Sequence, residues 1–234
     1  MKKIIEFKNV VKEYEIGERK LRAVDEISFE ILEGEFVVIL GPSGAGKSTV
    51  LNLLGGMDFA TSGEILVNDK NIVGLGDNAQ TQYRAENVGF VFQFYNLIPT
   101  LTAFENIALM KDIVKHPIDA QEVLEMVGLS GHEDQFPTQL SGGEQQRVSI
   151  ARAVAKNPTM LLCDEPTGAL DSETGIVVLT MLQQMSRDKN KTVIIVTHNS
   201  ALAEAADRVI RIKNGRIREI IQNESPKNIS EVNW

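Results

Sequence analysis

Hydrophobic and polar positions alternate along much of the N-terminal part of the chain, which is the pattern of β-strands with one buried face. The alternation is clear in residues 3–8 and again in residues 22–32 (RAVDEISFEIL). Residues 36–40 (FVVIL) are continuously apolar, as expected of a strand buried on both faces. The glycine-rich segment 41–49 follows this strand, and residues 48–54 (STVLNLL) predict a helix directly after it.

The middle of the chain changes from strand-like to helical patterning. Residues 63–72 (GEILVNDKNI) predict a β-hairpin with Asn68–Asp69 at its turn, and residues 88–92 predict another strand. From about residue 93 to residue 140, apolar residues recur at helical spacing. We therefore expect a helical insert in this region.

Strand-like patterns return in the last part of the chain. Apolar runs at 159–163 (TMLLC) and 192–196 (TVIIV) predict two buried strands separated by a helix. Residues 209–220 (VIRIKNGRIREI) predict a hairpin in which Asn214–Gly215 supplies the two positive-φ positions of a type I′ turn. The polar residues 222–234 are expected to be frayed. The whole pattern predicts a mostly parallel α/β core with a helical insert.

The composition is that of a soluble globular protein. The chain has 234 residues, of which 43% are hydrophobic and 24% charged, enough for one large domain or a domain with an added lobe. Acidic residues outnumber basic ones by 32 to 24, and the net charge of −8 argues against a nucleic-acid binder. The single cysteine, Cys163, excludes a disulfide framework and a cysteine zinc site. No apolar run approaches the roughly 20 residues of a membrane-spanning helix. We therefore expect a cytoplasmic protein that reaches a membrane only through a partner.

The segment 41–48 (GPSGAGKS) fits the phosphate-loop pattern G-x-x-x-x-G-K-S/T and stands between a buried strand and a helix, where that motif works. Its glycines let backbone amides and the helix N-terminus approach anionic oxygens. Lys47 is expected to neutralise the β and γ phosphates, and Ser48 to place its hydroxyl on Mg²⁺. The alternative is a glycine-rich turn of no chemical role, which this strand–loop–helix context disfavours.

A second acidic element follows the apolar run at 159–163. Asp164 is suited to hold Mg²⁺ through water, and Glu165 directly after it is suited to orient or deprotonate an attacking water. Alone, these carboxylates would indicate a solvated strand end. Together with a phosphate loop, they indicate hydrolysis. Cys163 is interpreted as a small apolar strand residue.

The motif LSGGEQQR (140–147) adds a third element. Together with the phosphate loop before it and DEPTGALD (164–171) after it, it resembles the nucleotide-binding domain of ABC-type ATPases. The resemblance covers about residues 3–220. The stretches GFVFQFYNLIPTLTAFENI (89–107) and CDEPTGALD (163–171) are similar to ATPases that drive macrolide-exporter, lipoprotein-release and cell-division type permeases.

The resemblance implies an α/β fold: a P-loop NTPase of the ABC type. Such a domain has a mostly parallel core sheet, an N-terminal antiparallel β subdomain and a helical insert subdomain. We expect the ATPase domain to span residues 1–221, with the helical subdomain at about 94–157, and the tail to span 222–234.

The resemblance also implies roles for single residues, and this sequence departs from the family pattern at none of the catalytic positions. Tyr14 would stack on adenine, and Asp171 would communicate between two sites. Glu165, His198 and Gln93 would be catalytic, and Mg²⁺ would be held by Ser48, Gln93 and Asp164. The full set implied to bind ATP is Tyr14, Gly41, Pro42, Ser43, Gly44, Ala45, Gly46, Lys47, Ser48, Thr49, Ser141, Gly142, Gly143, Glu144 and Asp171.

Two helix N-termini suited to anions, at 47–49 and at 141–143, are hard to reconcile with a protomer that works alone. In the family, Ser141, Gly142 and Gly143 match the signature loop. The family resolves this difficulty with a head-to-tail homodimer in which each signature loop faces the partner's phosphate loop. The family also implies a transmembrane permease partner. The apolar side chains that would form its docking groove, or else pack the insert's own core, are Phe94, Tyr95, Leu97, Ile98 and Leu101.

The sequence therefore favours an ATP-hydrolysing subunit, peripheral on the inner face of the cell membrane. It would energise a separate permease that exports or extracts a peptide, lipid-linked or drug-like substrate. One alternative is a regulatory ATPase whose permease transports nothing and signals across the membrane. Another is a soluble ABC ATPase that works on DNA or ribosomes. Such ATPases typically have coiled-coil insertions, tandem ATPase domains or basic extensions, whereas this sequence shows one domain, a short insert and acidic charge.

Overall fold

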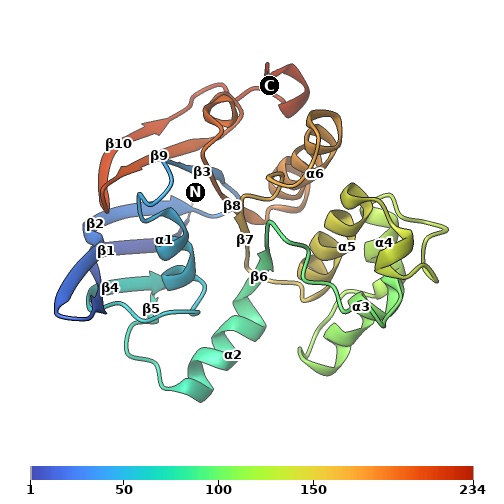
Figure 1. Ribbon diagram of the computed structural model, residues 1–234, viewed down its shortest axis with the longest axis horizontal. Coiled ribbons are helices and arrows are strands. Elements are labelled where there is room, and N and C mark those ends of the chain that lie inside the picture. The colour runs from blue at the N-terminus through green and yellow to red at the C-terminus, as the bar shows by residue number, and fades with distance from the viewer. Residues whose placement is uncertain (1, 234) are drawn as a thin grey trace.

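Two β-sheets and the helices around them make up the computed structural model, which describes residues 2–233 (Figure 1). One sheet is antiparallel, with strand order β2-β1-β4-β5. Along β2, burial alternates over the second half of the strand, as the sequence pattern predicts. The bounds of its strands are β1 Lys3–Ile16, β2 Arg19–Leu32, β4 Ser62–Val67 and β5 Lys70–Asn71.

The second sheet has strand order β10-β9-β3-β8-β7-β6. The pairs formed by β9, β3, β8, β7 and β6 are parallel, and β10 returns antiparallel beside β9. Every residue of β3 and β8 is buried, which confirms the prediction made from their continuous apolar runs. The strand bounds are β3 Phe36–Leu40, β6 Val88–Val91, β7 Met160–Asp164, β8 Thr192–Thr197, β9 Arg208–Lys213 and β10 Arg216–Gln222.

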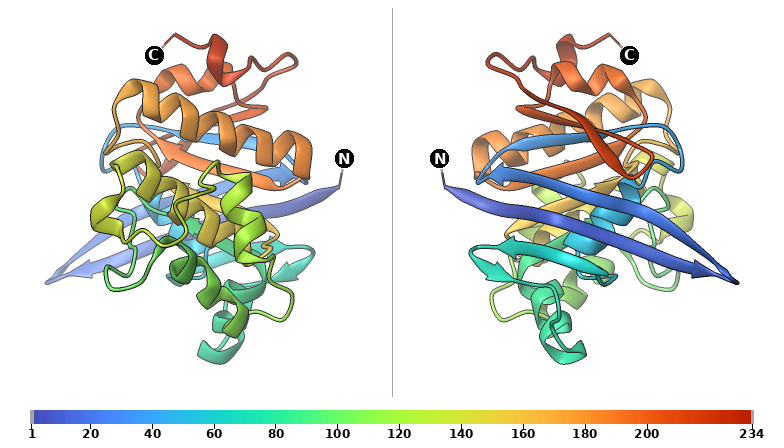
Figure 2. Two further views of the ribbon diagram at one scale, coloured as in Figure 1. Left: turned by 90° about the vertical axis from the view of Figure 1, so that its right-hand side faces the viewer. Right: turned by 90° about the vertical axis from the view of Figure 1, so that its left-hand side faces the viewer.

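Strand β3 contributes to two hydrophobic cores because its successive side chains point to opposite faces of the sheet. Val37 and Ile39 pack with the antiparallel sheet and with α1 (Lys47–Leu54). Val38 and Leu40 belong to the other core, which includes α6 (Ser172–Lys189) and the helices of the insert. Figure 2 shows these two layers on either side of the central sheet. The insert contains α3 (Ala103–Ala108), the 3₁₀ turn η1 (Leu109–Asp112), α4 (Ala120–Met126), η2 (Pro137–Gln139) and α5 (Gly142–Ala155).

The structure corrects two expectations about the elements and adds one helix. Helical structure does not begin near residue 93, because residues 92–102 are irregular and α3 begins at Ala103. The helix α2 (Asp77–Asn87) was not predicted. Residues 223–233, which follow β10, are not frayed. Ile229, in the 3₁₀ turn η4 (Ile229–Glu231), is fully buried in the core that contains α6. Within residues 2–233, no helix is both long and apolar enough to cross a membrane.

Candidate active site

The phosphate loop lies between the end of β3 and the start of α1. Gly44 and Gly46 have φ angles of +75° and +100°, which other residues rarely adopt. At Gly46 a Cβ would stand only 2.2 Å from the carbonyl oxygen of Ala23, so there is no room for a side chain at this position. The Lys47 ammonium donates to the carbonyl oxygens of Gly41 (2.8 Å) and Pro42 (3.1 Å). The loop is thus wrapped around its own lysine.

The turn of the β9–β10 hairpin is hydrogen-bonded to the phosphate loop. Asn214 and Gly215 have φ angles of +52° and +73°, which confirms the predicted turn. The backbone amide of Gly215 donates to the carbonyl of Ala45 in the phosphate loop (3.0 Å), and its carbonyl accepts from the amide of Asp25 on β2 (2.9 Å). The turn therefore connects the phosphate loop to the antiparallel sheet.

Asp164, the last residue of β7, faces the start of α1. The Ser48 hydroxyl donates to its Oδ1 at 3.1 Å. Burial raises the pKa of Asp164, and this hydrogen bond partly opposes the rise. Within residues 2–233, no three His, Cys, Asp or Glu side chains gather into a metal site. A hydroxyl and one carboxylate nevertheless fit Mg²⁺, which usually binds one or two protein oxygens and completes its shell with water and substrate phosphates.

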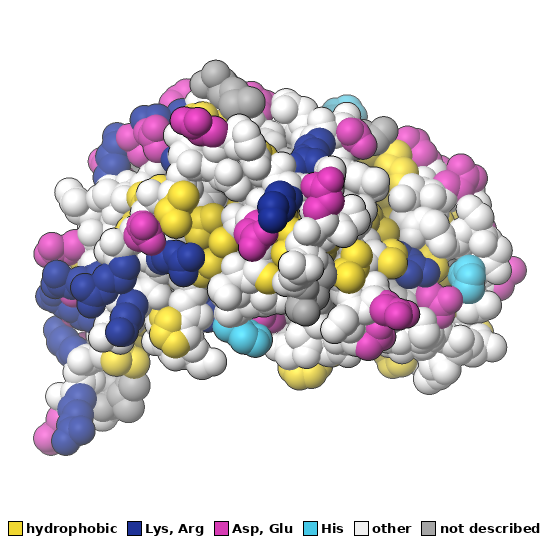
Figure 3. Space-filling model, turned by 90° about the horizontal axis from the view of Figure 1, so that it is seen from above, with side chains coloured by type: hydrophobic (Ala, Val, Ile, Leu, Met, Phe, Trp, Pro, Cys, Tyr) yellow, Lys and Arg dark blue, Asp and Glu magenta, His cyan; other side chains and the backbone are white. Residues whose placement is uncertain are grey.

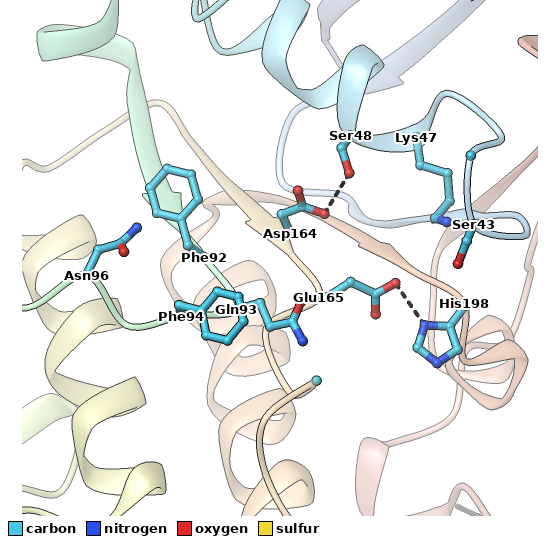
Figure 4. Close-up of a pocket in the computed structure, with 12 residues that line it drawn as sticks. Ser43, Lys47, Ser48, Phe92, Gln93, Phe94, Asn96, Asp164, Glu165 and His198 are labelled. Atoms are coloured by element: carbon cyan, nitrogen blue, oxygen red, sulfur yellow. Dashed lines mark hydrogen bonds and ion pairs between the residues drawn. The ribbon is translucent and has the colours of Figure 1, made fainter. Parts of the chain in front are cut away.

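Glu165 has a φ angle of +47° and is held by the last residue of β8 and by the residue after it. The Thr197 hydroxyl donates to Oε2 (3.0 Å), and Nδ1 of His198 lies 2.9 Å from Oε1. A non-glycine residue with positive φ at the end of a buried strand is uncommon and stores local strain. Figure 4 shows the Glu165 carboxylate and the Gln93 amide in the same cavity.

This cavity has a volume of about 580 Å³ and brings together most of the predicted chemistry. It is lined by Ser43, Gly44, Lys47, Ser48, Phe92, Gln93, Phe94, Asn96, Asp164, Glu165, Gly168 and His198. A second cavity, of about 480 Å³, lies on the other side of the phosphate loop and contains Tyr14 and Thr49. The two cavities share Gly44, Lys47 and Ser48, so one elongated ligand could occupy both.

Positive charge gathers near the second cavity although the whole chain is acidic. Lys and Arg side chains cluster at the end of the molecule where the β1–β2 and β9–β10 hairpins lie (Figure 3). Two of them are paired with Asp25, at 3.2 Å from Arg22 and 2.7 Å from Arg216. Arg22, which lines the second cavity, also pairs with Glu13 at 2.6 Å.

The signature loop is not brought to the phosphate loop of the same chain. Ser141 caps α5, where its hydroxyl accepts from the amide of Glu144 (3.3 Å) while the Glu144 carboxylate accepts from the amide of Ser141 (2.7 Å). Asp171 caps α6 through the amide of Thr174 (3.0 Å). Neither residues 141–144 nor Asp171 line either cavity.

Gln146, which sequence reasoning did not single out, links two parts of the site. Its side chain is fully buried in α5 and donates from Nε2 to the carbonyls of Pro166 (2.8 Å) and Phe92 (3.3 Å). These carbonyls flank Glu165 and Gln93, respectively. A glutamine within a polar motif gives no sequence signal for such a long-range bridge.

The fold, the phosphate loop and the paired carboxylates define a P-loop nucleotide-binding protein. The family model for the ABC transporter matches residues 24–168, and the chain belongs to this family.

Curated relatives match this chain over nearly its full length. An uncharacterized ABC transporter ATP-binding protein of Thermotoga maritima is 44% identical over 225 residues, which cover 94% of this chain and 96% of the relative. The chain also matches 36% of the length of the macrolide export ATP-binding/permease protein MacB of Shigella flexneri, at 43% identity and over 100% of its own length.

A solved structure matches as well. The dimeric ATP-binding cassette MJ0796 in a post-hydrolysis state with ADP and Pi superposes with a TM-score of 0.86 at 40% identity, covering 95% of this chain and 100% of that one. MJ0796 itself is an ABC transporter ATP-binding protein of Methanocaldococcus jannaschii. The predicted ABC-type fold is thus confirmed, and the chain is an ABC transporter ATP-binding subunit.

Proposed function

We propose that this chain hydrolyses ATP and thereby energises a separate transmembrane permease. The observation that carries the proposal is the Glu165 carboxylate, fixed by Thr197 and His198 in the cavity that also contains Lys47 and Asp164. A carboxylate held next to a phosphate loop is suited to accept a proton from an attacking water. The solved relative that holds ADP and Pi supports hydrolysis.

Each residue of the cavity has a proposed part. The Lys47 ammonium exchanges its two loop carbonyls for phosphate oxygens and neutralises their charge. Ser48, Asp164 and Gln93 would hold Mg²⁺, which would supply positive charge to screen and orient the phosphates. Glu165 orients the water. His198, whose side chain is 70% exposed, holds Glu165 through Nδ1 and contacts the terminal phosphate through its other ring nitrogen. Tyr14 in the second cavity stacks on the adenine.

We further propose that the signature loop completes the site of a second copy. Ser141 and its neighbours offer a helix N-terminus for phosphate, yet they line neither cavity of their own chain. A head-to-tail homodimer would put each signature loop against the partner's phosphate loop. The solved MJ0796 cassette is dimeric, which supports the pairing of two copies.

The permease would dock on the irregular segment 92–102. The side chains of Phe94 and Ile98 are 72% and 40% exposed, so they do not pack inside this chain and are available to a partner. Leu97, in contrast, packs against the core. Leu97 thus fits the alternative that these side chains pack the insert. The relative named for macrolide export supports an exporter. A regulatory complex that signals without transport would use the same ATPase chemistry and the same docking segment.

The substitution Glu165→Gln tests the proposal. It removes the base but keeps the shape and one acceptor, so we expect ATP binding to persist while hydrolysis falls by about 10²–10⁴-fold. Trapped ATP should then hold the protein as a dimer in size-exclusion chromatography with Mg²⁺-ATP. The matched control is Glu64→Gln, an exposed carboxylate on β4. Near-normal turnover of Glu165→Gln would remove Glu165 from the catalytic role.

A further inference from the structure

Tyr14 is held in place by a carboxylate from a distant part of the chain. Its hydroxyl donates to Oδ2 of Asp58 at 2.6 Å. Asp58 stands in the segment 55–61, between α1 and β4, which runs beside β1 through the bond from the Thr61 amide to the Val11 carbonyl (2.8 Å). The sheet fixes the backbone of Tyr14, which pairs with Leu21, and the carboxylate fixes the far end of the side chain.

Lys12 occupies one face of the same ring. Its ammonium lies 4.7 Å from the ring centroid and forms an ion pair with Oδ1 of Asp58 (2.5 Å). It also donates to the carbonyl of Phe59 (2.8 Å). The side chains of Lys12 and Asp58 are only 12% and 23% exposed, so the pair is shielded from solvent. A base could therefore stack only on the opposite face of Tyr14.

We propose that Asp58 is a positioning residue for nucleotide binding, which orients the Tyr14 ring for the base before the nucleotide arrives. This inference rests on the proposed role of Tyr14 in stacking on adenine. A ring that is free to change rotamer must be ordered when the ligand binds, and this ordering weakens affinity. Lys12 completes the arrangement, since its ion pair with Asp58 holds in place the carboxylate that accepts from the Tyr14 hydroxyl.

A purely structural role makes a different prediction. Asp58 also accepts from the amide of Phe59 (2.7 Å), and its loss could loosen the segment 55–61 in general. Such loosening would reach the adjoining helix α1 and the phosphate loop. Binding of phosphate groups would then weaken together with binding of the base. A ligand that has the phosphates but no base therefore separates the two roles.

Isothermal titration calorimetry with Mg²⁺-ATP and with Mg²⁺-tripolyphosphate makes this comparison on the full chain. We expect Asp58→Ala and Tyr14→Phe each to weaken ATP binding by about two- to tenfold and to leave tripolyphosphate binding unchanged. Because both changes remove the same hydrogen bond, from the Tyr14 hydroxyl to Asp58, the double variant should be no weaker than the worse single variant. In steady-state kinetics, KM for ATP should rise while kcat stays unchanged.

Other outcomes would overturn the inference. Equal losses for ATP and tripolyphosphate would indicate a structural role, and additive losses in the double variant would show that the two residues act independently. Tyr14→Phe removes a single hydroxyl and keeps the test decisive even where Asp58→Ala does not fold. Asp69→Asn, on the exposed β4–β5 turn, is the control carboxylate. A wild-type chain that binds no ATP would instead refute the proposed function.

Discussion

The substitution Gly215→Ala tests whether the β9–β10 hairpin shapes the phosphate loop. Gly215 has a φ angle of +73°, and its amide donates to Ala45 of the loop at 3.0 Å. An added Cβ would stand 3.0 Å from the carbonyl oxygen of Ala23 and 3.3 Å from that of Arg22. Gly17 is the matched control. It is also a hairpin glycine, with a φ angle of +62°, but its Cβ would meet nothing within 4 Å.

The two substitutions share one energetic term and differ in another. Placing alanine in the left-handed region destabilises the folded chain by about 1–2 kcal/mol. Alanine also lowers the conformational entropy of the unfolded chain, which offsets about 0.4–1 kcal/mol of this loss. Gly17→Ala should therefore lower the free energy of unfolding by about 1 kcal/mol. Gly215→Ala adds overpacking against sheet backbone, typically about 1–3 kcal/mol, for a total loss of about 2–4 kcal/mol. It should also displace Ala45 and weaken ATP binding by about tenfold or more, since small misplacements of a binding site have large effects.

Urea denaturation followed by far-UV circular dichroism measures the stabilities, and calorimetry with Mg²⁺-ATP measures binding. Gly17→Ala should bind ATP like the wild type. The reasoning is refuted if Gly215→Ala loses no more stability than the control. It is refuted equally if the variant is destabilised but binds ATP normally, because the hairpin would then not transmit its position to the loop.

Three further outcomes are expected. Burial lowers the pKa of Lys156 from 10.5 to about 8, so the unfolded chain binds more protons between these values. The free energy of unfolding should therefore rise as the pH rises from 8 to 10.5, and an equal slope in Lys156→Met would contradict this. Lys47→Ala and Ser141→Arg should each be inactive, yet their mixture should trap ATP in one intact shared site. No trapping despite confirmed subunit exchange would exclude that site. Ile98→Asp should abolish co-purification with the permease while basal ATPase activity persists. The control Ile220→Asp, at an equally exposed position, should still co-purify. If Ile98→Asp also co-purifies, the docking surface lies elsewhere.

The parts of the fold that the sequence predicted depend on short-range patterns. The phosphate loop and the Asn214–Gly215 turn consist of residues whose conformations are set locally by glycine and asparagine. Helix α2 was missed because its sequence, DNAQTQYRAEN, has no apolar stripe and buries only Gln80 and Tyr83. The frayed tail expected from its polar composition is wrong because two apolar residues in the polar segment, Ile229 and Val232, dock it in the core with α6.

The missed features of the site are long-range contacts. Gln146 lies 20 residues from Pro166, and Asp58 lies 44 residues from Tyr14. Such hydrogen bonds depend on how the sheets and helices are placed, which neither periodicity nor spacing records. The positive φ of Glu165 is likewise set by its surroundings, because the strand pattern before it gives no sign of strain.

The place of β3 in its sheet has a consequence for protein synthesis. This strand leads into the phosphate loop, but its two neighbours are β8 (Thr192–Thr197) and β9 (Arg208–Lys213), from the far end of the chain. At translation rates of about 5–20 residues per second, a nascent chain therefore exposes this wholly apolar strand without partners for on the order of ten seconds or more. Chaperones would meet β3 with both edges open. The nucleotide site can form only after most of the chain has left the ribosome, although its central motif emerges early.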